Sequence, residues 1–444
     1  MALQFKNKPQ PPQQAQIPVN MPTLQAPQPQ GPRHEPVMVG VPGLPIGMPP
    51  FLDFNRLHIN TIQERMVPPP LQMPGADLPR AINFAADLGG CYWWRLGMPE
   101  ILLNLKQKAI IHSMTMMITD PRYLQGYHTV KLQRQATPHQ LMYVKFLQDV
   151  VKQCGLKKLI FEIDDVVFKE DIPMFNRCRE AFDNEEVRTC IMEMMKMSDE
   201  ITVTCDYMRD YYIEKTGNKK ITVIPNYPMR MWADRFYDEK RLAMNFEKNK
   251  KKPRIAAFIS GTHIDVVNKT NQSDDYTHLV QAIIRARKDF EFSFCGAFPL
   301  PIKPYIDMGE IKFIDWFPLP DFPKGMYETG VNVCFAALQD NHFNRSKSDI
   351  KLVEAACIGY PCVCQDMVTY KNALLKFNTG DEFIDQIKKV TKNVDTYMDY
   401  CKKSRAYADT MWLDNENNLM KHHEAMFTDF GSSQRKYLLE TNPK

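Results

Sequence analysis

The chain has 444 residues, 44% of them hydrophobic, and a formal net charge of +4 at pH 7. This length exceeds one ordinary core and indicates two domains with additional tails. The positive excess permits contact with a polyanion but does not require one, because dedicated nucleic-acid binders usually carry a clear basic stripe.

The cysteines and the lack of recognisable targeting signals indicate in which cellular compartment the protein is expected. Most of the 11 cysteines lie in apolar runs, without a paired Cys-x-x-Cys framework. We interpret them as small buried hydrophobes in a reducing environment, with Cys362 and Cys364 at alternate positions of a strand and not as metal ligands. No apolar run is as long as a membrane span, and the N-terminus lacks the apolar core of a signal peptide. These features predict a cytoplasmic protein.

The first segment, residues 1–78, differs in composition from the rest. Of the 33 prolines, 18 fall in the first 80 positions, where they are mixed with glutamines. Such a segment buries too little apolar surface to offset the entropy of ordering it. We therefore predict a disordered, Pro/Gln-rich arm.

From residue 79 onwards, apolar runs alternate with helical periods. Met142, Phe146 and Val150 recur at spacing four, which is typical of one face of an amphipathic helix. Up to residue 244 the pattern predicts strands over 109–118, 128–133, 158–163, 200–205 and 220–224, and helices over 138–154, 185–197 and 206–216. Strands that alternate with helices indicate crossover connections and a parallel sheet. Residues 79–244 are thus predicted to form a Rossmann-like N-terminal domain.

A charged segment, 245–253, interrupts this pattern and is predicted to be an interdomain linker. The alternation then resumes, with strands over 254–260, 291–295, 311–314, 331–337 and 361–364, and helices over 276–287 and 346–358. We predict a second Rossmann-like domain over 254–395 and a helical tail over 396–444. Ligands of such sheets bind at the carboxyl ends of the strands, so we expect the site between the two domains.

The stretch 344–363, NRSKSDIKLVEAACIGYPCV, is the most informative part of the sequence. Ser346 and Asp349 fit a capping box, which predicts that a helix begins at Ser346. Its free N–H groups would lie at the end of the preceding strand, where they favour an anion such as a diphosphate.

Three side chains of this predicted helix, Lys347, Lys351 and Glu354, share one face because they are four and three positions apart. A lysine neutralises phosphate charge, and a carboxylate further along accepts hydrogen bonds from both ribose hydroxyls. The alternative is a lysine–glutamate pair on a solvated face.

This segment resembles the donor-binding helix of GT-B glycosyltransferases related to family 4. The matching pattern is K-S-D-I-K-x-x-E-A-x-x-x-G-x-P-C-V, where the usual family form is E-x7-E before a G-x-P-V strand. Glu354 matches the second glutamate, which binds the donor ribose in the family, whereas Ser346 replaces the first. We expect Lys347 or Asn344 to substitute for the missing glutamate, with Ser348 and Lys351 as further donor contacts.

A second segment, 255–265, resembles the first strand and turn of the family's C-terminal domain. Family members have a glycine and a basic residue there that contact the diphosphate. Gly261 allows close approach of the backbone, and Thr262 and His263 can donate to phosphate. His263 is also a candidate catalytic residue; alternatively it is a loop histidine bonded to a nearby carboxylate. Lys269 is expected to supply a second positive charge.

Three further segments agree with the resemblance, which spans about residues 80 to 430. Residues 200–226 are similar to the strand–helix–strand before the family's linker, and Cys295-Gly296-Ala297 matches a glycine turn under the base. Residues 412–427 look like the final helix. The implied fold is α/β with two Rossmann-like domains in the GT-B architecture, and the helices of 396–444 cross back to the first domain.

In the first domain, Gly89 and Gly90 allow a tight turn before a helix that ends near Leu105. In the family the corresponding loop faces the acceptor and the donor phosphates. Gly90, Arg95 and Arg134 are therefore expected to contact acceptor or phosphate, the alternative for Arg95 being a surface salt bridge.

Two acids, Asp164 and Asp165, follow a buried strand at the edge where such active sites open. We expect one of them to orient an acceptor hydroxyl or to act as base. The competing interpretations are a metal-binding D-x-D of a GT-A transferase and a capping role for Asp165. The GT-A interpretation is disfavoured because it leaves the second Rossmann half unexplained, so we predict no metal.

The sequence thus predicts a metal-independent, retaining hexosyl- or pentosyltransferase with a nucleotide-sugar co-substrate and no other cofactor. Its resemblance to phage-encoded members implies a location in the host cytoplasm and an acceptor such as a hydroxymethylated base of phage DNA, a protein or a glycan. A basic rim for DNA would come from Arg122, Lys131, Arg134 and Lys145. An alternative from another class is a non-catalytic, virion-associated or binding protein with a remnant Rossmann pair.

Overall fold

The computed structural model describes residues 78–115, 117, 124, 126–154, 156–265 and 274–441. All of them fall within one compact unit, Phe51–Lys444. The predicted arm up to residue 77, together with Arg122 and Lys269, lies outside the described residues.

Short apolar strands, buried along most of their length, build the first sheet. Its six strands are parallel and pair in the order β2-β1-β3-β4-β5-β6. The strands are β1 (Arg80–Phe84), β2 (Ile110–Met114), β3 (Thr129–Gln133), β4 (Lys158–Glu162), β5 (Glu200–Val203) and β6 (Ile221–Val223). The strand order reverses between β1 and β3, and ligands of such doubly wound sheets bind at this switch point.

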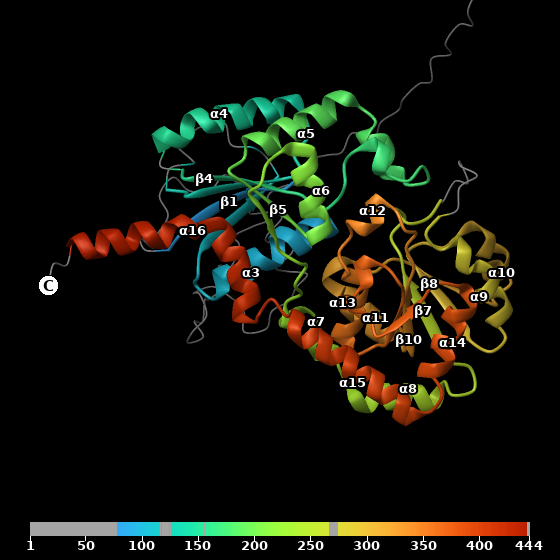
Figure 1. Cartoon of the computed structure of the whole chain (residues 1–444). Coiled ribbons are helices and arrows are strands. Elements are labelled where there is room, and N and C mark those ends of the chain that lie inside the picture. Colours follow the sequence, from blue (N-terminus) through green and yellow to red (C-terminus); the bar gives the residue numbers. More distant parts are fainter. Residues whose placement is uncertain are drawn as a thin grey trace, which may run out of the picture. The chain divides into compact units, whose positions relative to one another are not determined.

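Helices connect these strands and cover both faces of the sheet. They are α2 (Gly90–Tyr92), the π-helix η1 (Trp93–Gly97), α3 (Met98–Leu105), α4 (Pro138–Cys154), the 3-10 helices η3 (Lys169–Asp171) and η4 (Arg177–Phe182), α5 (Glu185–Met197) and α6 (Asp206–Thr216). In Figure 1, α4 and α5 lie on one side of the sheet and α3 on the other. We call this sheet with its helices the first lobe.

The second sheet is also parallel and has six strands, in the order β12-β11-β10-β7-β8-β9. The strands are β7 (Arg254–Phe258), β8 (Glu291–Cys295), β9 (Lys312–Ile314), β10 (Val333–Ala336), β11 (Cys362–Gln365) and β12 (Leu375–Phe377). The order reverses between β7 and β10, as in dinucleotide-binding domains. We call this sheet with its helices the second lobe.

The helices and 3-10 turns of the second lobe follow the same alternation. They are α7 (Arg230–Ala233), η5 (Asp234–Phe236), α8 (Glu239–Lys248), η6 (Thr277–Leu279), α9 (Val280–Ala286), η7 (Leu300–Ile302), α10 (Lys303–Asp307), η8 (Leu319–Asp321), α11 (Phe322–Thr329), α12 (His342–Arg345), α13 (Ile350–Ile358), η9 (Val368–Tyr370) and α14 (Gly380–Val390). The helix α8 begins after Asp238, whose side chain accepts from the Arg241 amide. The segment predicted as a linker, 245–253, is therefore helical through Lys248.

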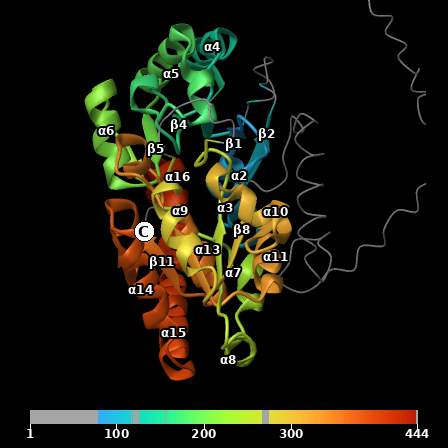
Figure 2. The ribbon, with the colours of Figure 1, turned by 90° about the vertical axis from the view of Figure 1, so that its right-hand side faces the viewer.

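The C-terminal helices contact both lobes (Figures 1 and 2). The helix α15 (Val394–Met411) packs against α13 and α8, and α16 (Glu416–Thr441) packs against α3. The Thr129 hydroxyl donates to the Met426 carbonyl over 2.6 Å, and Lys158 Nζ donates to the Ala425 carbonyl over 2.6 Å. These bonds attach the tail to the first sheet, beside β3 and β4.

A cluster of tryptophans lies where the first lobe meets α7. The Trp94 and Trp232 rings are edge to face, with centroids 5.3 Å apart, and Trp93 packs against Trp232 in the same manner. Trp93 and Trp94 are both buried. The burial of such aromatic pairs stabilises the folded state beyond their apolar area.

The predicted fold class, α/β with two Rossmann-like halves, is confirmed. The GT-A alternative is wrong, because the second half forms a complete sheet with its own crossover helices. The strands β1 and β12 were not predicted, since β1 directly follows the Pro/Gln-rich segment and β12 has only three residues. Within the described part of the chain, no helix has both the length and the apolarity needed to cross a bilayer.

Candidate functional site

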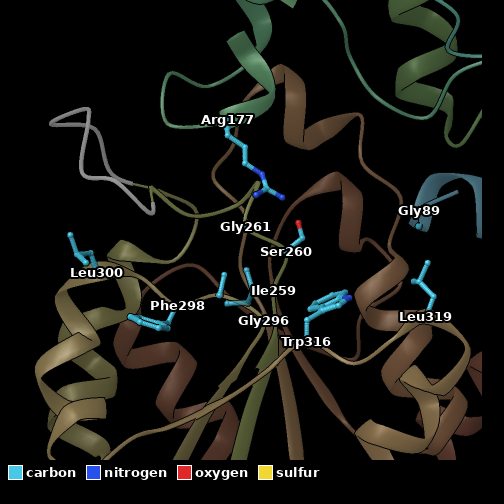
Figure 3. Close-up of a pocket in the computed structure, with 12 residues that line it drawn as sticks. Gly89, Arg177, Ile259, Ser260, Gly261, Gly296, Phe298, Leu300, Trp316 and Leu319 are labelled. Carbon is cyan, nitrogen blue, oxygen red and sulfur yellow. The ribbon is translucent and has the colours of Figure 1, made fainter. Parts of the chain in front are cut away.

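A pocket with a volume of about 660 Å³ opens where strands of the two sheets end. Its second-lobe wall follows the carboxyl ends of β7, β8 and β9, and its residues there are Ile259, Ser260, Gly261, Gly296, Ala297, Phe298, Leu300, Trp316 and Leu319 (Figure 3). Gly89, Gly90 and Arg177 line it from the first lobe. We call it the cleft pocket; its volume is in the range of small-molecule sites.

The turn after β7 forms one wall of the cleft pocket. The Ser260 and Thr262 hydroxyls are hydrogen-bonded over 2.6 Å, and the His263 amide donates to the Ser260 carbonyl. At Gly261 an added Cβ would lie 3.5 Å from Cζ of Arg177, so the turn and this arginine are in close approach. The structure therefore places Gly261 in the pocket wall, where a ligand can reach its backbone.

His263, next in the same turn, is held by a buried acid. Its Nδ1 lies 2.8 Å from Oδ2 of Asp275, a residue that is 1% exposed. Asp275 Oδ1 accepts further hydrogen bonds from the Gln339 amide and from Asn344 Nδ2. The alternative interpretation of His263, a histidine bonded to a nearby carboxylate, matches this geometry.

Asn344 was expected to contact the donor, and the structure corrects this. Its side chain is fully buried and donates to Asp275 and to the Gln339 carbonyl. Burial leaves no surface for a ligand, so Asn344 acts on the site only by fixing Asp275.

The helix predicted to begin at Ser346 begins instead at Ile350. Ser346 donates its hydroxyl to the His342 carbonyl over 2.8 Å, and Asp349 accepts from the Tyr407 hydroxyl. Both side chains of the expected capping box are therefore engaged elsewhere. Asp349 still precedes the first turn of α13, but without a side-chain capping bond.

Glu354 lies on a buried face of α13 and not on a solvated face. It is 8% exposed and pairs with Lys351 Nζ, 3.2 Å away. Burial raises the pKa of Glu354, and Lys351 counteracts this only in part. Lys351 Nζ is in turn 5.4 Å from the ring centroid of Trp316, which connects this pair to the wall of the cleft pocket.

Trp316 follows β9 and is 40% exposed, an unusual exposure for the largest side chain. Gly296, with φ of +86°, lies under it, and an added Cβ there would come within 2.3 Å of the Trp316 ring. Only glycine adopts this backbone conformation readily and leaves this space. The ring is thus a partly exposed aromatic surface at the pocket.

Lys347 reaches across to the first lobe, where it forms an ion pair with Asp165. Although burial alone lowers the pKa of Lys347, the Asp165 carboxylate raises it above its ordinary value. Ser348 likewise accepts a hydrogen bond from Asn226 Nδ2, over 2.9 Å. Both residues were expected at the donor; the structure shows them joining the two lobes.

Asp164 and Asp165 come together with Arg134 and Cys91 at the end of β4. Arg134 lies 2.8 Å from Asp87 and 3.8 Å from Asp165, with its backbone in the left-handed region at φ of 44°. Burial, and then the charge of Asp165, raise the pKa of Asp164. A carboxyl whose pKa is raised toward neutrality is better suited to proton transfer.

The ligand atoms of Cys91, Asp164 and Asp165 lie within 4.8 Å of one another, close enough to hold a metal ion. However, Lys347 and Arg134 already compensate the charge of Asp165. This compensation reduces the attraction for a further cation.

Arg95 was expected to contact acceptor or phosphate, and this expectation is wrong. Its side chain is fully buried, 2.6 Å from Glu162, and also donates to Asn226 and to backbone carbonyls of the first lobe. Lys131, expected on a basic rim, is 3% exposed and pairs with Glu162 over 2.9 Å. Both cations stabilise the interior of the first sheet, and of the expected rim, Lys145 remains exposed on α4.

Sequence reasoning missed Arg177, Trp316 and Asp275. Trp316 had a detectable signal, because it comes two residues after a predicted strand, at the edge where ligands bind. Arg177 lies in the irregular segment between β4 and α5, where no periodicity or motif marks it. Asp275 has no local signal, because its partners are distant in the sequence.

No family model matches this sequence, and no curated protein matches it. Among solved structures, Anabaena Alr3699/HepE in complex with UDP is similar, with a TM-score of 0.51 and 10% identity over 78% of this chain and 98% of that chain. An alpha-glucosyltransferase in complex with UDP and a 13-mer DNA containing an HMU base has a TM-score of 0.48 and 10% identity, over 76% and 95%. For S. aureus TarM the TM-score is 0.44 at 10% identity, over 67% and 55%. At such identities the likeness concerns the fold alone, which is the two-domain GT-B-like fold.

Proposed function

We propose that this chain is a glycosyltransferase that moves a sugar from a nucleotide-sugar donor to an acceptor hydroxyl. One observation carries the proposal: the cleft pocket joins a partly exposed aromatic ring and a glycine turn at the carboxyl ends of adjacent parallel strands, and the Lys351–Glu354 pair lies beside the ring. These three features match the base, the ribose and the diphosphate of such a donor.

In this assignment each part of the donor has one contact of suitable chemistry. The base stacks on Trp316, since every base has a π-face that an aromatic ring can cover. The Glu354 carboxylate accepts hydrogen bonds from the ribose hydroxyls, and Lys351 favours its ionised form. The diphosphate lies at the turn of residues 260–262, where backbone N–H groups favour an anion.

The reaction breaks the bond between the anomeric carbon and the diphosphate oxygen, and forms a bond to the acceptor oxygen. The nucleoside diphosphate leaves with the electron pair, and the acceptor proton goes to a base. Asp164 is the preferred candidate for that base because of its raised pKa and its place at the end of β4. Asp275 fixes the ring of His263 beside the phosphates. We extend the proposal to a metal-independent, retaining reaction, which the family resemblance supports.

The first test is binding of UDP-, GDP- and ADP-sugars, followed by calorimetry and by thermal shift. Binding of at least one sugar nucleotide, weakened in Glu354→Gln, is expected; the exposed Glu328 provides the matched control, Glu328→Gln. If no nucleotide binds to the folded protein, the proposal fails and the non-catalytic binding protein is favoured.

Acceptors are then compared with the donor that binds. The printed partner of one similar structure, DNA with an HMU base, makes such DNA one test substrate, and oligosaccharides are the other. Transfer to DNA should weaken steeply with salt, whereas transfer to a saccharide should not. Chelator treatment in the same assay tests metal independence, and the anomeric configuration of the product tests retention.

A further inference from the structure

Arg177 differs from the other cations at the cleft, because no described residue compensates its charge. Lys347 pairs with Asp165, Arg134 with Asp87, and Lys351 with Glu354. Over the described ranges, the Arg177 guanidinium forms no ion pair and no hydrogen bond. An uncompensated guanidinium in a pocket is a strong attractor for an anion.

The backbone that carries Arg177 is well anchored. Asn176, 2% exposed, precedes η4 and accepts a hydrogen bond from the Cys178 amide over 2.8 Å. Arg179 donates to the carbonyls of Lys169 and Ile172. The segment is thus fixed on both sides of residue 177, while the side chain itself extends into the pocket.

The side chain points from the first lobe toward the turn of the second lobe (Figure 3). Its Cζ would lie 3.5 Å from a Cβ added at Gly261, so the guanidinium faces the Ser260–Gly261 backbone directly. Two donors of different origin therefore converge on the same part of the pocket. One is the turn of the second lobe, and the other is the planar fork of an arginine from the first lobe.

We infer that Arg177 binds the diphosphate of the donor from the opposite lobe and makes the site selective for a nucleoside diphosphate. This inference rests on the proposed function. The phosphate oxygens can reach both the guanidinium and the turn at Gly261 from the open side of the pocket, and the arginine provides the positive charge that Lys347, engaged with Asp165, does not. Because Arg177 touches the leaving group, it also stabilises the charge that develops there during transfer.

The experiment compares UDP, GDP and ADP with their nucleosides on the wild-type protein, Arg177→Ala and Arg177→Lys. For the nucleotide that the wild type binds, Arg177→Ala should weaken diphosphate binding by about tenfold to 100-fold, as expected for lost charged hydrogen bonds. Nucleoside binding, followed by ligand-observed NMR, should change less than about twofold, because the nucleoside carries no anion. The diphosphate affinity of Arg177→Lys should lie between those of the wild type and Arg177→Ala, since lysine retains the charge but not the planar fork of the guanidinium.

Arg285→Ala is the matched control, since it removes an exposed arginine of the second lobe whose partner is Asp381. Melting temperatures verify that every variant is folded. Equal losses for diphosphate and nucleoside in Arg177→Ala, or no loss for either, would overturn the role of Arg177 while leaving the proposed function intact. Absence of nucleotide binding by the wild type overturns the proposed function itself, together with this inference.

Discussion

The two sheets differ in the charged side chains found at the carboxyl ends of their strands. In the first lobe, Glu162 lies between Arg95 and Lys131, and Asp165 lies between Lys347 and Arg134. In the second lobe, the pocket wall carries a turn and an aromatic ring, and the Lys351–Glu354 pair lies beside that ring. Opposite charges that are buried together mainly keep each other ionised and leave little attraction for a ligand. The lesson is that the paired charges of the first lobe hold the protein together, whereas we expect the ligand among the side chains of either lobe that this pairing does not engage.

The largest expected effect concerns stability. Replacing Arg95 by alanine leaves Glu162 buried with one partner fewer, which should lower the free energy of unfolding by about 3–5 kcal/mol. Urea denaturation measures this, with Arg285→Ala as the exposed control. A loss as small as that of the control would show that the first lobe does not depend on its internal charge pairing.

The same pairing predicts a pH dependence. Although burial alone raises the pKa of Glu162, Arg95 and Lys131 hold it below its ordinary value. A lowered folded-state pKa means that the stabilisation is present above the unfolded-state pKa and is lost as the pH falls through the folded-state pKa. The wild type should therefore lose stability on acidification over that range more steeply than Arg95→Ala.

The next largest effect is expected on ligand binding, from a substitution in the second lobe. Glu354→Gln should weaken sugar-nucleotide binding by about tenfold or more, because hydrogen bonds to a charged group are lost. Burial raises the pKa of Glu354, so in the wild type the affinity should fall as the pH drops through this raised pKa. Calorimetric titration across pH with the sugar nucleotide that the wild type binds should give a flat profile for the glutamine variant. A pH dependence identical to that of the wild type would exclude Glu354 as its source.

Removal of the exposed Trp316 ring should weaken nucleotide binding by a comparable or smaller factor. Trp316→Ala should cost about 1–3 kcal/mol of nucleotide binding, as for other base-stacking aromatics. Trp316→Phe should retain most of the affinity. Gly296→Ala should act in the same direction as Trp316→Ala, because its Cβ would displace the ring. Inorganic pyrophosphate is the comparison ligand, and its affinity should not change in either Trp316 variant.

The smallest effect is expected for the ion pair between the lobes. Lys347 and Asp165 are each about one-fifth exposed, and solvent reduces the worth of such pairs to about 1 kcal/mol or less. A double-mutant cycle with Lys347→Ala and Asp165→Ala in urea denaturation measures the coupling. A coupling of several kcal/mol would mean that this pair contributes to stability as strongly as the buried charge pairs of the first lobe.

Much of the fold was predictable because its signals are local. The alternation of short apolar runs with helical periods marked most strands of both sheets, and the glycine turn at 261 was located from the family resemblance of residues 255–265. The spacing of Lys351 and Glu354 correctly placed them together on α13. The helix start was wrong, because Ser346 and Asp349 found partners in His342 and Tyr407 that no local pattern reveals.

By itself, the sequence determined the α/β class, the order of the strands along the chain, and the segments that end at the cleft. The tertiary structure alone decided which charges are compensated. In the folded chain, Arg95 is buried, Lys347 pairs with Asp165, and Arg177 faces Gly261 from the other lobe. The physical reason is that periodicity records which face of an element is apolar, whereas a charge acquires its role from neighbours that only folding brings within a few ångströms.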